Sequence, residues 1–280
     1  MTTLTLTAPA KLNLFLHITG RRDDGYHNLQ TVFQLLDHGD TLDIAATETG
    51  AIRVLPELAD VPLKDNLIYK AARLLQQHSH CPKGADITLH KVLPMGGGIG
   101  GGSSDAATTL LGLNQLWGLN LPLEELAELG AQLGADVPVF IHGRSAWAEG
   151  IGEQLTPLDL PEDYFVVLTP DCHVATAKIF SHKGLTRDTP VIKVAAFLEQ
   201  GGHNDCQPLV QNLYPEVDKA LNWLVKFADA KMTGTGACVF AKVDSQEQGQ
   251  KILEQAPDDL KGFVARGVNL SPTHRQLSGQ

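Results

Sequence analysis

The sequence contains no apolar run of about 18 residues, the length that a membrane-spanning helix needs. It also lacks an excess of basic residues, because 32 acidic and 22 basic side chains give a net charge of −10. Binders of nucleic acid and of anionic membrane surfaces depend on clustered Lys and Arg. The first residues alternate polar and apolar side chains, which is not the pattern of a secretory signal peptide. We therefore expect a cytoplasmic protein that binds neither nucleic acid nor membranes.

Cysteine is scarce and unpaired in the sequence. A chain of 280 residues can bury a core without disulfides, so a reducing compartment is the natural interpretation. The run from His78 to Cys81 contains potential metal ligands, but zinc sites usually take two ligand pairs and no second cluster completes this one. We expect no dedicated metal-binding residue. The four cysteines form no CxxC pair and are Cys81, Cys172, Cys206 and Cys238.

Hydrophobic periodicity predicts an α+β protein. Strands are predicted at 3–8, 11–18, 31–36, 41–45, 86–92, 164–168, 237–243 and 261–267, with a hairpin at 144–158 that turns at 150–152. Helices are predicted at 66–77 with Asp65 as cap, 104–117, 122–133 with Gly134 after its end, 175–181, 206–214, 216–227 and 246–255. The order of these elements indicates two lobes, residues 1–160 and residues 161–280.

The strongest local signal is a loop of six glycines between positions 96 and 102, interrupted only by Ile99. Glycine has no Cβ, so successive backbone N–H groups can converge on one ligand. The loop leads into a predicted helix, whose first N–H groups are unpaired and carry partial positive charge. This arrangement predicts a polyphosphate site. Ser103 and Ser104 could cap the helix or donate their hydroxyl groups to phosphate or Mg²⁺.

Three common nucleotide loops do not fit these glycines. A Walker loop needs a Lys after its last glycine, and none is present. A dinucleotide-binding unit needs a strand after the helix, whereas a second helix is predicted here. The H-R-D and D-F-G signatures of protein kinases are absent from the sequence. The loop therefore belongs to another class of phosphate binder.

The segment PMGGGIGGGSS at 94–104 resembles the phosphate loop of the GHMP kinases. Two further segments agree with this resemblance, APAKLNL at 8–14 and MTGTGA at 232–237. The resemblance implies an ATP-dependent kinase of small molecules. It also implies a two-lobed fold, with an N-terminal lobe like the second domain of ribosomal protein S5 and a ferredoxin-like C-terminal lobe, between which the substrates meet.

Additional segments narrow the resemblance to GHMP kinases of the non-mevalonate isoprenoid pathway, whose acceptor is CDP-methylerythritol. They are RDDGYHNLQTVFQ at 22–34, DNL at 65–67, GADVPVF at 134–140 and GTGACVF at 234–240. The DGYH portion is the most discriminating of them. Two alternatives stay open: a GHMP kinase for a mevalonate- or homoserine-type acceptor, and a catalytically silent nucleotide or metabolite sensor with the same fold. The sequence does not indicate an oligomeric state.

The resemblance implies a catalytic pair formed by Lys11 and Asp136. Asp136 would act as the general base that takes the proton from the acceptor hydroxyl group. Lys11 would lie beside it and stabilise the negative charge that develops on the acceptor oxygen. The structural alternatives are that Asp136 caps the turn before Pro138 and that Lys11 is a solvated strand residue.

The resemblance also implies a pocket for a pyrimidine. Tyr26 would stack on one face of the base, and the ring or backbone of His27 would hydrogen-bond its polar edge. Phe180, from the C-terminal lobe, would close the other face, unless it is a core residue of a short helix. Asn13 and Thr176 complete the implied substrate contacts.

On the nucleotide side, ATP is expected to arrive with Mg²⁺ that phosphates and water largely coordinate. Asp105 stands where Asn is common in the family, which adds negative charge beside the phosphate site. For Lys91, the structural alternative is a solvated surface charge. The residues implied to contact ATP are Asn66, Lys91, Pro94, Met95, Gly96, Gly97, Gly98, Ile99, Gly100, Gly101, Gly102, Ser103 and Ser104.

Overall fold

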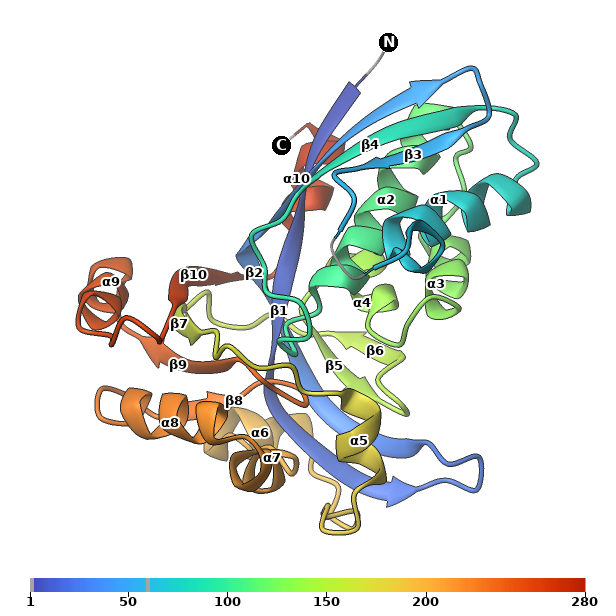
Figure 1. Cartoon of the computed structure of the whole chain (residues 1–280). Coiled ribbons are helices and arrows are strands. Elements are labelled where there is room, and N and C mark those ends of the chain that lie inside the picture. The colour runs from blue at the N-terminus through green and yellow to red at the C-terminus, as the bar shows by residue number, and fades with distance from the viewer. Residues whose placement is uncertain (1–2, 59–60, 280) are drawn as a thin grey trace.

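The computed structural model describes residues 3–58 and 61–279, and two long strands run through both of its lobes (Figure 1). These strands, β1 (Thr3–Arg21) and β2 (His27–Thr47), form one antiparallel hairpin. The prediction of four short strands here was wrong. Pro9 and Gly39, which look like strand breakers, face each other beside a shift in the strand register. A β-bulge accepts such residues and bends the strands without ending them.

The other strands extend this hairpin into a sheet that reaches both lobes. They are β3 (Ile52–Leu55), β4 (Gly84–His90), β5 (Ala146–Glu149), β6 (Gln154–Pro157), β7 (Tyr164–Leu168), β8 (Ala230–Met232), β9 (Val239–Val243) and β10 (Gly262–Val268). The hydrogen-bonded order is β3-β4-β2-β10-β7-β9-β8, with β1 and β5 also paired to β2 and β6 paired to β5. Among these strands only β3 and β4 pair in parallel.

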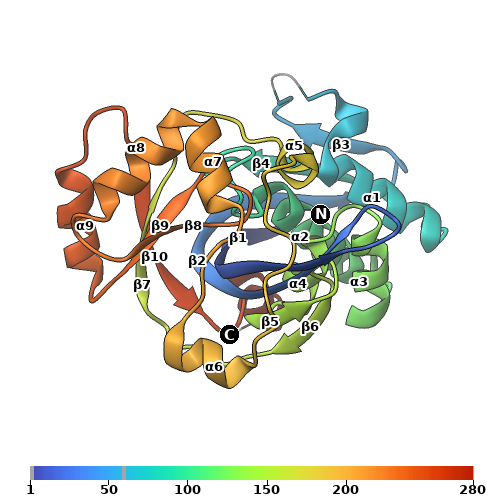
Figure 2. The same cartoon turned by 90° about the horizontal axis from the view of Figure 1, so that it is seen from below.

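Helices pack on the sheet in each lobe, as the view from below shows (Figure 2). In the N-terminal lobe they are α1 (Leu67–His78), α2 (Gly101–Trp117), α3 (Leu123–Ala131) and α4 (Val137–His142), after a short 3-10 turn at Leu63–Asp65. The later helices are α5 (Thr176–Ser181), α6 (Val194–Gln200), α7 (Gln207–Leu213), α8 (Pro215–Leu224), α9 (Gln246–Glu254) and α10 (Pro272–Ser278). No helix in the described ranges is both long and apolar enough to cross a bilayer.

Most predicted elements are present, but several ends differ; the helix predicted from residue 104, for example, begins at Gly101, and two further differences concern helix ends. The cap of α1 is Asn66 rather than Asp65, because the Asn66 side chain accepts a hydrogen bond of 2.9 Å from the N–H of Ile68. Gly134 does not terminate α3, whose last turn ends at Gln132 in the right-handed conformation. The elements α4, α6, α10, β3 and β8 were not predicted, because most are shorter than the windows in which periodicity is visible.

A buried apolar cluster at the junction of the lobes anchors the glycine loop. Ala10 and Leu12 of β1 meet Phe165 of β7 and Phe240 of β9 there. Ile99, at the centre of the loop, is 1% exposed and belongs to this cluster. Burying an isoleucine side chain is worth roughly 1.5–3 kcal/mol. The loop is therefore held at its middle, while Gly96 and Gly102 near its two ends stay exposed.

The end of the described chain returns to the N-terminal lobe. Gln276 in α10 accepts a hydrogen bond of 2.8 Å from the Thr7 N–H, and Thr273 donates one of 2.5 Å to the Thr7 carbonyl group. The strand β10 pairs with both β2 and β7. The division of the chain at residue 160 stays a prediction.

Candidate active site

The glycine loop connects β4 to α2 and uses backbone conformations that favour glycine. Gly96, Gly98 and Gly100 have φ angles of 69°, 73° and 76°. This left-handed region costs an L-residue with a Cβ roughly 1–2 kcal/mol. Gly100 is the N-cap of α2 and has no side chain with which to cap it. The first N–H groups of α2 are therefore available to an anionic ligand.

Both lobes hold this loop in place. The backbone N–H of Lys11 donates to the carbonyl group of Ile99 at 3.0 Å, and Lys11 Nζ donates to that of Gly98 at 3.2 Å. From the C-terminal lobe, Thr233 approaches so closely that a Cβ on Gly98 would lie 2.6 Å from its carbonyl oxygen. The loop is thus clamped between β1 and the 233–238 segment.

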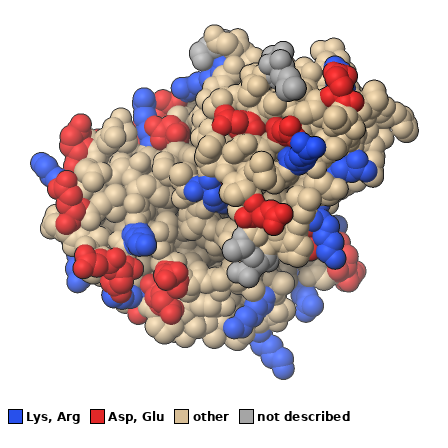
Figure 3. All heavy atoms as spheres, turned by 45° about the horizontal axis from the view of Figure 1, so that its top comes forward, with Lys and Arg blue, Asp and Glu red and all other residues tan. Residues whose placement is uncertain are grey.

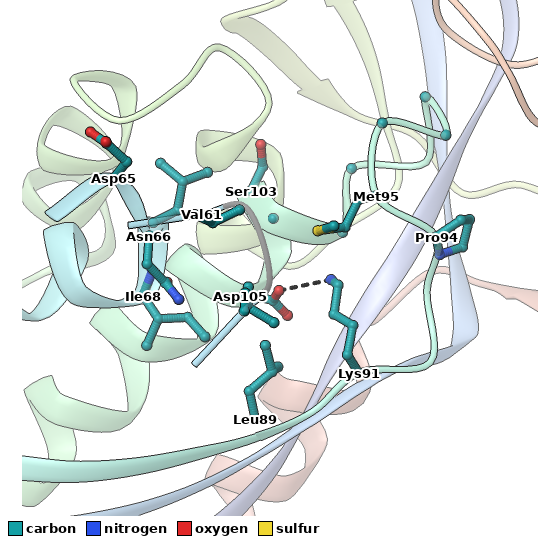
Figure 4. Close-up of a pocket in the computed structure, with 18 of the residues that line it drawn as sticks. Val61, Asp65, Asn66, Ile68, Leu89, Lys91, Pro94, Met95, Ser103 and Asp105 are labelled. Carbon is teal, nitrogen blue, oxygen red and sulfur yellow. Dashed lines mark hydrogen bonds and ion pairs between the residues drawn. The ribbon is translucent and has the colours of Figure 1, made fainter. Parts of the chain in front are cut away.

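A cavity of about 430 Å³ lies against the glycine loop and the start of α2 (Figure 4). It brings together most of the residues expected to contact ATP: Asn66, Lys91, Pro94, Met95, Gly96, Gly97, Gly98, Gly100, Gly101, Gly102 and Ser103. Two expected residues do not line it. The Ile99 side chain lies in the junction core. Ser104 is fully buried, and its N–H donates to the Gly100 carbonyl group at 2.8 Å.

Lys91 forms a buried ion-pair network inside this cavity. Its Nζ lies 2.5 Å from Asp40 and 3.0 Å from Asp105, and Figure 4 shows it pointing toward Asp105. Asp40 is 0% exposed and also accepts the backbone N–H groups of Val92 and Leu93 at 2.6 and 2.8 Å. Lys91 is therefore not a solvated surface charge. The negative charge that Asp105 was expected to add is paired with Lys91.

The ionisation of Asp105 predicts a pH-dependent stability. Burial, helped by the negative charge of the nearby Asp40, raises the pKa of Asp105 to about 7 against the opposing effect of Lys91. Because the unfolded pKa is lower, the folded state binds more protons between the two values, and stability is lost as pH rises toward about 7. The change Asp105→Asn removes this titration, and its amide oxygen can still accept from Lys91.

We expect Asp105→Asn to be more stable than the parent above pH ~7 by about 1 kcal/mol or more, a difference that shrinks toward pH ~5. Urea unfolding of both proteins across this range measures it. Asp86→Asn is the matched control, because Asp86 is half exposed and 3.9 Å from Arg53. Stability curves that stay parallel for Asp105→Asn and the parent would contradict the expectation.

A second cavity, of about 620 Å³, contains the residues expected to bind the pyrimidine. Tyr26, His27, Thr176 and Phe180 line it. The rings of His27 and Phe180 are 5.3 Å apart and tilted by 30°, whereas Tyr26 is 60% exposed. Phe180 also touches the C-terminal core with part of its ring. Thr176 lines both cavities, so they adjoin at this residue.

Lys11 and Asp136 form an ion pair of 3.2 Å. Lys11 is 3% exposed, and its Nζ lies 5.1 Å above the Phe33 ring, so it is not a solvated strand residue. Asp136 stands at the N-cap of α4, but its side chain makes no capping hydrogen bond. Neither structural alternative therefore describes this pair. The neighbour of Asp136, Ala135, lines the second cavity.

Asn13 is buried beneath the pair rather than lining either cavity. Its Oδ1 accepts from Lys11 Nζ at 2.5 Å, and its Nδ2 donates to the Thr31 hydroxyl group at 2.9 Å. The backbone N–H of Asn13 donates to the hydroxyl group of Thr233 at 2.8 Å. Asn13 thus orients Lys11. Sequence reasoning missed the roles of Asp40, Thr31 and Thr233, although Thr31 and Thr233 lie in segments that the family resemblance already marked.

Figure 3 shows the molecule hollowed between its lobes, with side chains of both charges around the hollow. The sequence also matches the models of two known domains. Residues 66–144 match the model of the GHMP kinases N terminal domain, and residues 191–262 match that of the GHMP kinases C terminal domain.

Two relatives named 4-diphosphocytidyl-2-C-methyl-D-erythritol kinase are similar over nearly the whole chain. The Tolumonas auensis protein is 57% identical over 267 residues, which cover 95% of this chain and 94% of the relative. The Pseudomonas aeruginosa PAO1 protein is 57% identical over 274 residues, which cover 98% of this chain and 97% of the relative.

Solved structures agree with the fold. A crystal structure of 4-(cytidine 5'-diphospho)-2C-methyl-D-erythritol kinase superposes with a TM-score of 0.84 at 31% identity, covering 95% of this chain and 100% of that one. Homoserine kinase from Cytophaga hutchinsonii has a TM-score of 0.73 at 17% identity, covering 97% and 96% of the two chains, which supports the fold alone. The predicted α+β GHMP kinase fold is confirmed.

Proposed function

Because the chain belongs to the 4-diphosphocytidyl-2-C-methyl-D-erythritol kinases of the GHMP kinase family, we propose that it phosphorylates the 2-hydroxyl group of that alcohol. The protein is an ATP-dependent kinase. One geometric observation carries the proposed chemistry. Lys11 Nζ lies 3.2 Å from the Gly98 carbonyl group of the glycine loop and 3.2 Å from the Asp136 carboxylate, so it connects the loop that lines the first cavity to Asp136, whose neighbour Ala135 lines the second.

We propose that ATP occupies the first cavity with its triphosphate on the glycine loop. The free N–H groups at the start of α2 and the positive end of its dipole favour a phosphate there. The opposite side of the cavity is lined by Asn66 and by the apolar side chains of Ile68 and Leu89, which suits the nucleoside. Lys91 would meet the phosphates as an ammonium group already paired with two carboxylates.

The acceptor would occupy the second cavity. Its pyrimidine would lie against the aromatic side chains of Tyr26 and Phe180, with His27 at its polar edge. Its methylerythritol end would extend past Thr176, which borders both cavities, toward Asp136. This orientation directs the acceptor hydroxyl group toward the terminal phosphate of ATP.

In the proposed step, the acceptor oxygen forms a bond to the γ-phosphorus while the bond from that phosphorus to the β–γ bridging oxygen breaks. The hydroxyl proton moves to a carboxylate oxygen of Asp136, and ADP leaves with the bonding electrons. A positioned base typically contributes about 10²–10⁴-fold in rate. The Lys11 ammonium group stabilises the negative charge that develops on the acceptor oxygen.

Mg²⁺ is proposed to accompany ATP and to neutralise charge on its phosphates. In residues 3–58 and 61–279, no three His, Cys, Asp or Glu side chains gather into a metal site. Mg²⁺ commonly keeps several water ligands and binds substrate phosphates together with only one or two protein groups. A site without a cluster of protein ligands is compatible with that kind of coordination. The hydroxyl group of Ser103, at the start of α2, lines the cavity and could be one such group.

An ADP-release assay with a panel of acceptor alcohols tests the proposal. We expect ATP-dependent turnover with CDP-methylerythritol and little with mevalonate or homoserine. Preferred turnover of mevalonate or homoserine would assign the chain to another acceptor. ATP binding without turnover of any acceptor would identify a sensor instead of an enzyme.

The close contact at Gly98 predicts that Gly98→Ala disturbs ATP binding. The new Cβ would lie 2.6 Å from the carbonyl oxygen of Thr233 and 2.9 Å from that of Gly236, so the loop must move. A displacement of about 1 Å can cost a reaction about 100-fold, and we expect a loss of this size in kcat/KM for ATP. Steady-state kinetics with varied ATP measures it.

Gly118→Ala is the matched control for this change. Gly118 has a similar φ of 71°, but a Cβ there would meet nothing within 4 Å. It ends α2 at the opposite end from the glycine loop. Backbone strain alone would affect both variants equally, so equal losses in kcat/KM would contradict the role of the close contact.

A further inference from the structure

Arg187, in the connection between α5 and α6, links two parts of the pyrimidine pocket. Its Nε donates to Nε2 of His27 at 3.0 Å. Its two terminal nitrogens donate to the carbonyl groups of Leu185, Phe180 and His182 at 2.9, 2.9 and 2.7 Å. One guanidinium group therefore joins the first residue of β2 to the end of α5, and these four bonds occupy four of its five N–H donors.

The bond from Arg187 determines the protonation of His27. A guanidinium group stays charged and can only donate, so Nε2 of His27 must accept and the ring proton must lie on Nδ1. Burial, Arg187 and Arg21 all lower the pKa of His27, in that order. The ring is therefore neutral at neutral pH and offers Nδ1–H as its only donor. None of the described residues accepts a hydrogen bond from that nitrogen.

Arg187 also holds the second aromatic side chain of the pocket. Its bond to the Phe180 carbonyl group fixes the last turn of α5, and the Phe180 ring lies 5.3 Å from that of His27. The connection itself is anchored to β1, because the Thr189 N–H donates to the Ile18 carbonyl group at 3.1 Å. The two rings therefore depend on one side chain that neither cavity exposes.

We propose that Arg187 is a positioning residue for the acceptor, which holds His27 in its neutral Nδ1–H form and Phe180 in place before the pyrimidine binds. This inference rests on the proposed function of the second cavity. A preformed pocket avoids the entropic cost of ordering side chains during binding, so it increases the affinity for the acceptor. Among the described residues, the Lys11–Asp136 pair has no hydrogen bond to Arg187. A substitution of Arg187 should therefore leave the phosphoryl-transfer step unchanged.

The kinetic test compares Arg187→Ala and Arg187→Lys with the parent. We expect the KM for CDP-methylerythritol to rise about tenfold or more in Arg187→Ala, with kcat and the KM for ATP nearly unchanged. The KM for CDP-methylerythritol in Arg187→Lys should stay close to that of Arg187→Ala, because one ammonium group cannot reproduce the planar set of donors of a guanidinium group. Thr186→Ala is the matched control, since Thr186 is exposed in the same connection.

The second readout is nitrogen NMR of the His27 ring, which distinguishes its two neutral tautomers without substrate. We expect the Nδ1–H tautomer in the parent and in Thr186→Ala. Both Arg187 variants should lose this preference, and in Arg187→Ala the pKa of His27 should rise toward its ordinary value. A merely structural role for Arg187 would not change the tautomer in a folded variant.

An unchanged acceptor KM together with an unchanged His27 tautomer in either folded Arg187 variant would overturn the inference. If Arg187→Ala does not fold, Arg187→Lys provides the test. A parent-like acceptor KM and a parent-like His27 tautomer in Arg187→Lys would show that the guanidinium group is not needed. If the parent itself does not phosphorylate CDP-methylerythritol, the proposed function fails. The NMR result then still decides whether Arg187 sets the state of His27.

Discussion

Asp136→Asn is expected to bind ATP like the parent and to lose about two to four orders of magnitude in kcat. Asn has nearly the same shape as Asp but cannot accept the hydroxyl proton. The variant should fold normally, because the Asp136 side chain is 35% exposed and makes no capping bond to α4. Single-turnover kinetics with CDP-methylerythritol, together with a direct measurement of ATP binding, would separate loss of chemistry from loss of binding.

Asp159→Asn is the control for this change. Asp159 is 82% exposed, lies 3.3 Å from Arg144 at the surface and lines neither cavity. We expect its kcat to equal that of the parent. A kcat close to the parent value in Asp136→Asn would remove Asp136 from the mechanism. A loss of ATP affinity equal to the loss of turnover would instead assign Asp136 a role in nucleotide binding.

Lys11→Met is expected to lower kcat by about 10²–10³-fold, the usual cost of removing one group that stabilises a developing oxyanion. Methionine retains most of the apolar stem but not the ammonium group. It also leaves the buried Asn13 Oδ1 without the ammonium donor and leaves the Gly98 carbonyl group with only the longer bond, of 3.4 Å, from the Thr233 hydroxyl group. We therefore expect a loss of roughly 1–3 kcal/mol in the free energy of unfolding as well. Thermal unfolding and steady-state kinetics measure the two effects separately.

Lys242→Met controls for the loss of a paired lysine at the surface. Lys242 in β9 is 60% exposed and lies 2.7 Å from Asp163. Its kcat should be unchanged, and its stability should fall by less than about 1 kcal/mol. If Lys11 and Asp136 act as a unit, the double variant Lys11→Met/Asp136→Asn should be little slower than the worse single variant. Fully additive losses would show that the two residues act independently.

The sequence predicted the glycine loop and the candidate catalytic residues, but not the long-range contacts that hold the site residues in place. The glycine loop and its helix were predictable because the glycine spacing and the apolar run that follows it are local features. Asp40 was not predictable as the partner of Lys91, because 51 residues separate them and nothing near Asp40 marks it as buried. The same holds for Arg187 and His27, which are 160 residues apart.

Strand lengths were mispredicted for a related reason. Pro9 and Gly39 are individually strand breakers, and only their pairing across one register shift makes both acceptable inside long strands. Helix ends were also misplaced, because capping depends on which side chain reaches a backbone N–H. Asn66 does so at α1 and Asp65 does not.

By itself, the sequence determined the family of the protein, because the family motifs consist of residue types at short, fixed spacing. The resemblance that these motifs carry predicted the phosphate loop and the roles of Lys11 and Asp136. The tertiary structure alone decided that Lys11 faces Asp136, that Thr176 borders both cavities and that Arg187 reaches His27. These contacts join segments far apart in the chain. Their geometry is set by how the sheet and its helices pack around the junction core, which no local pattern encodes.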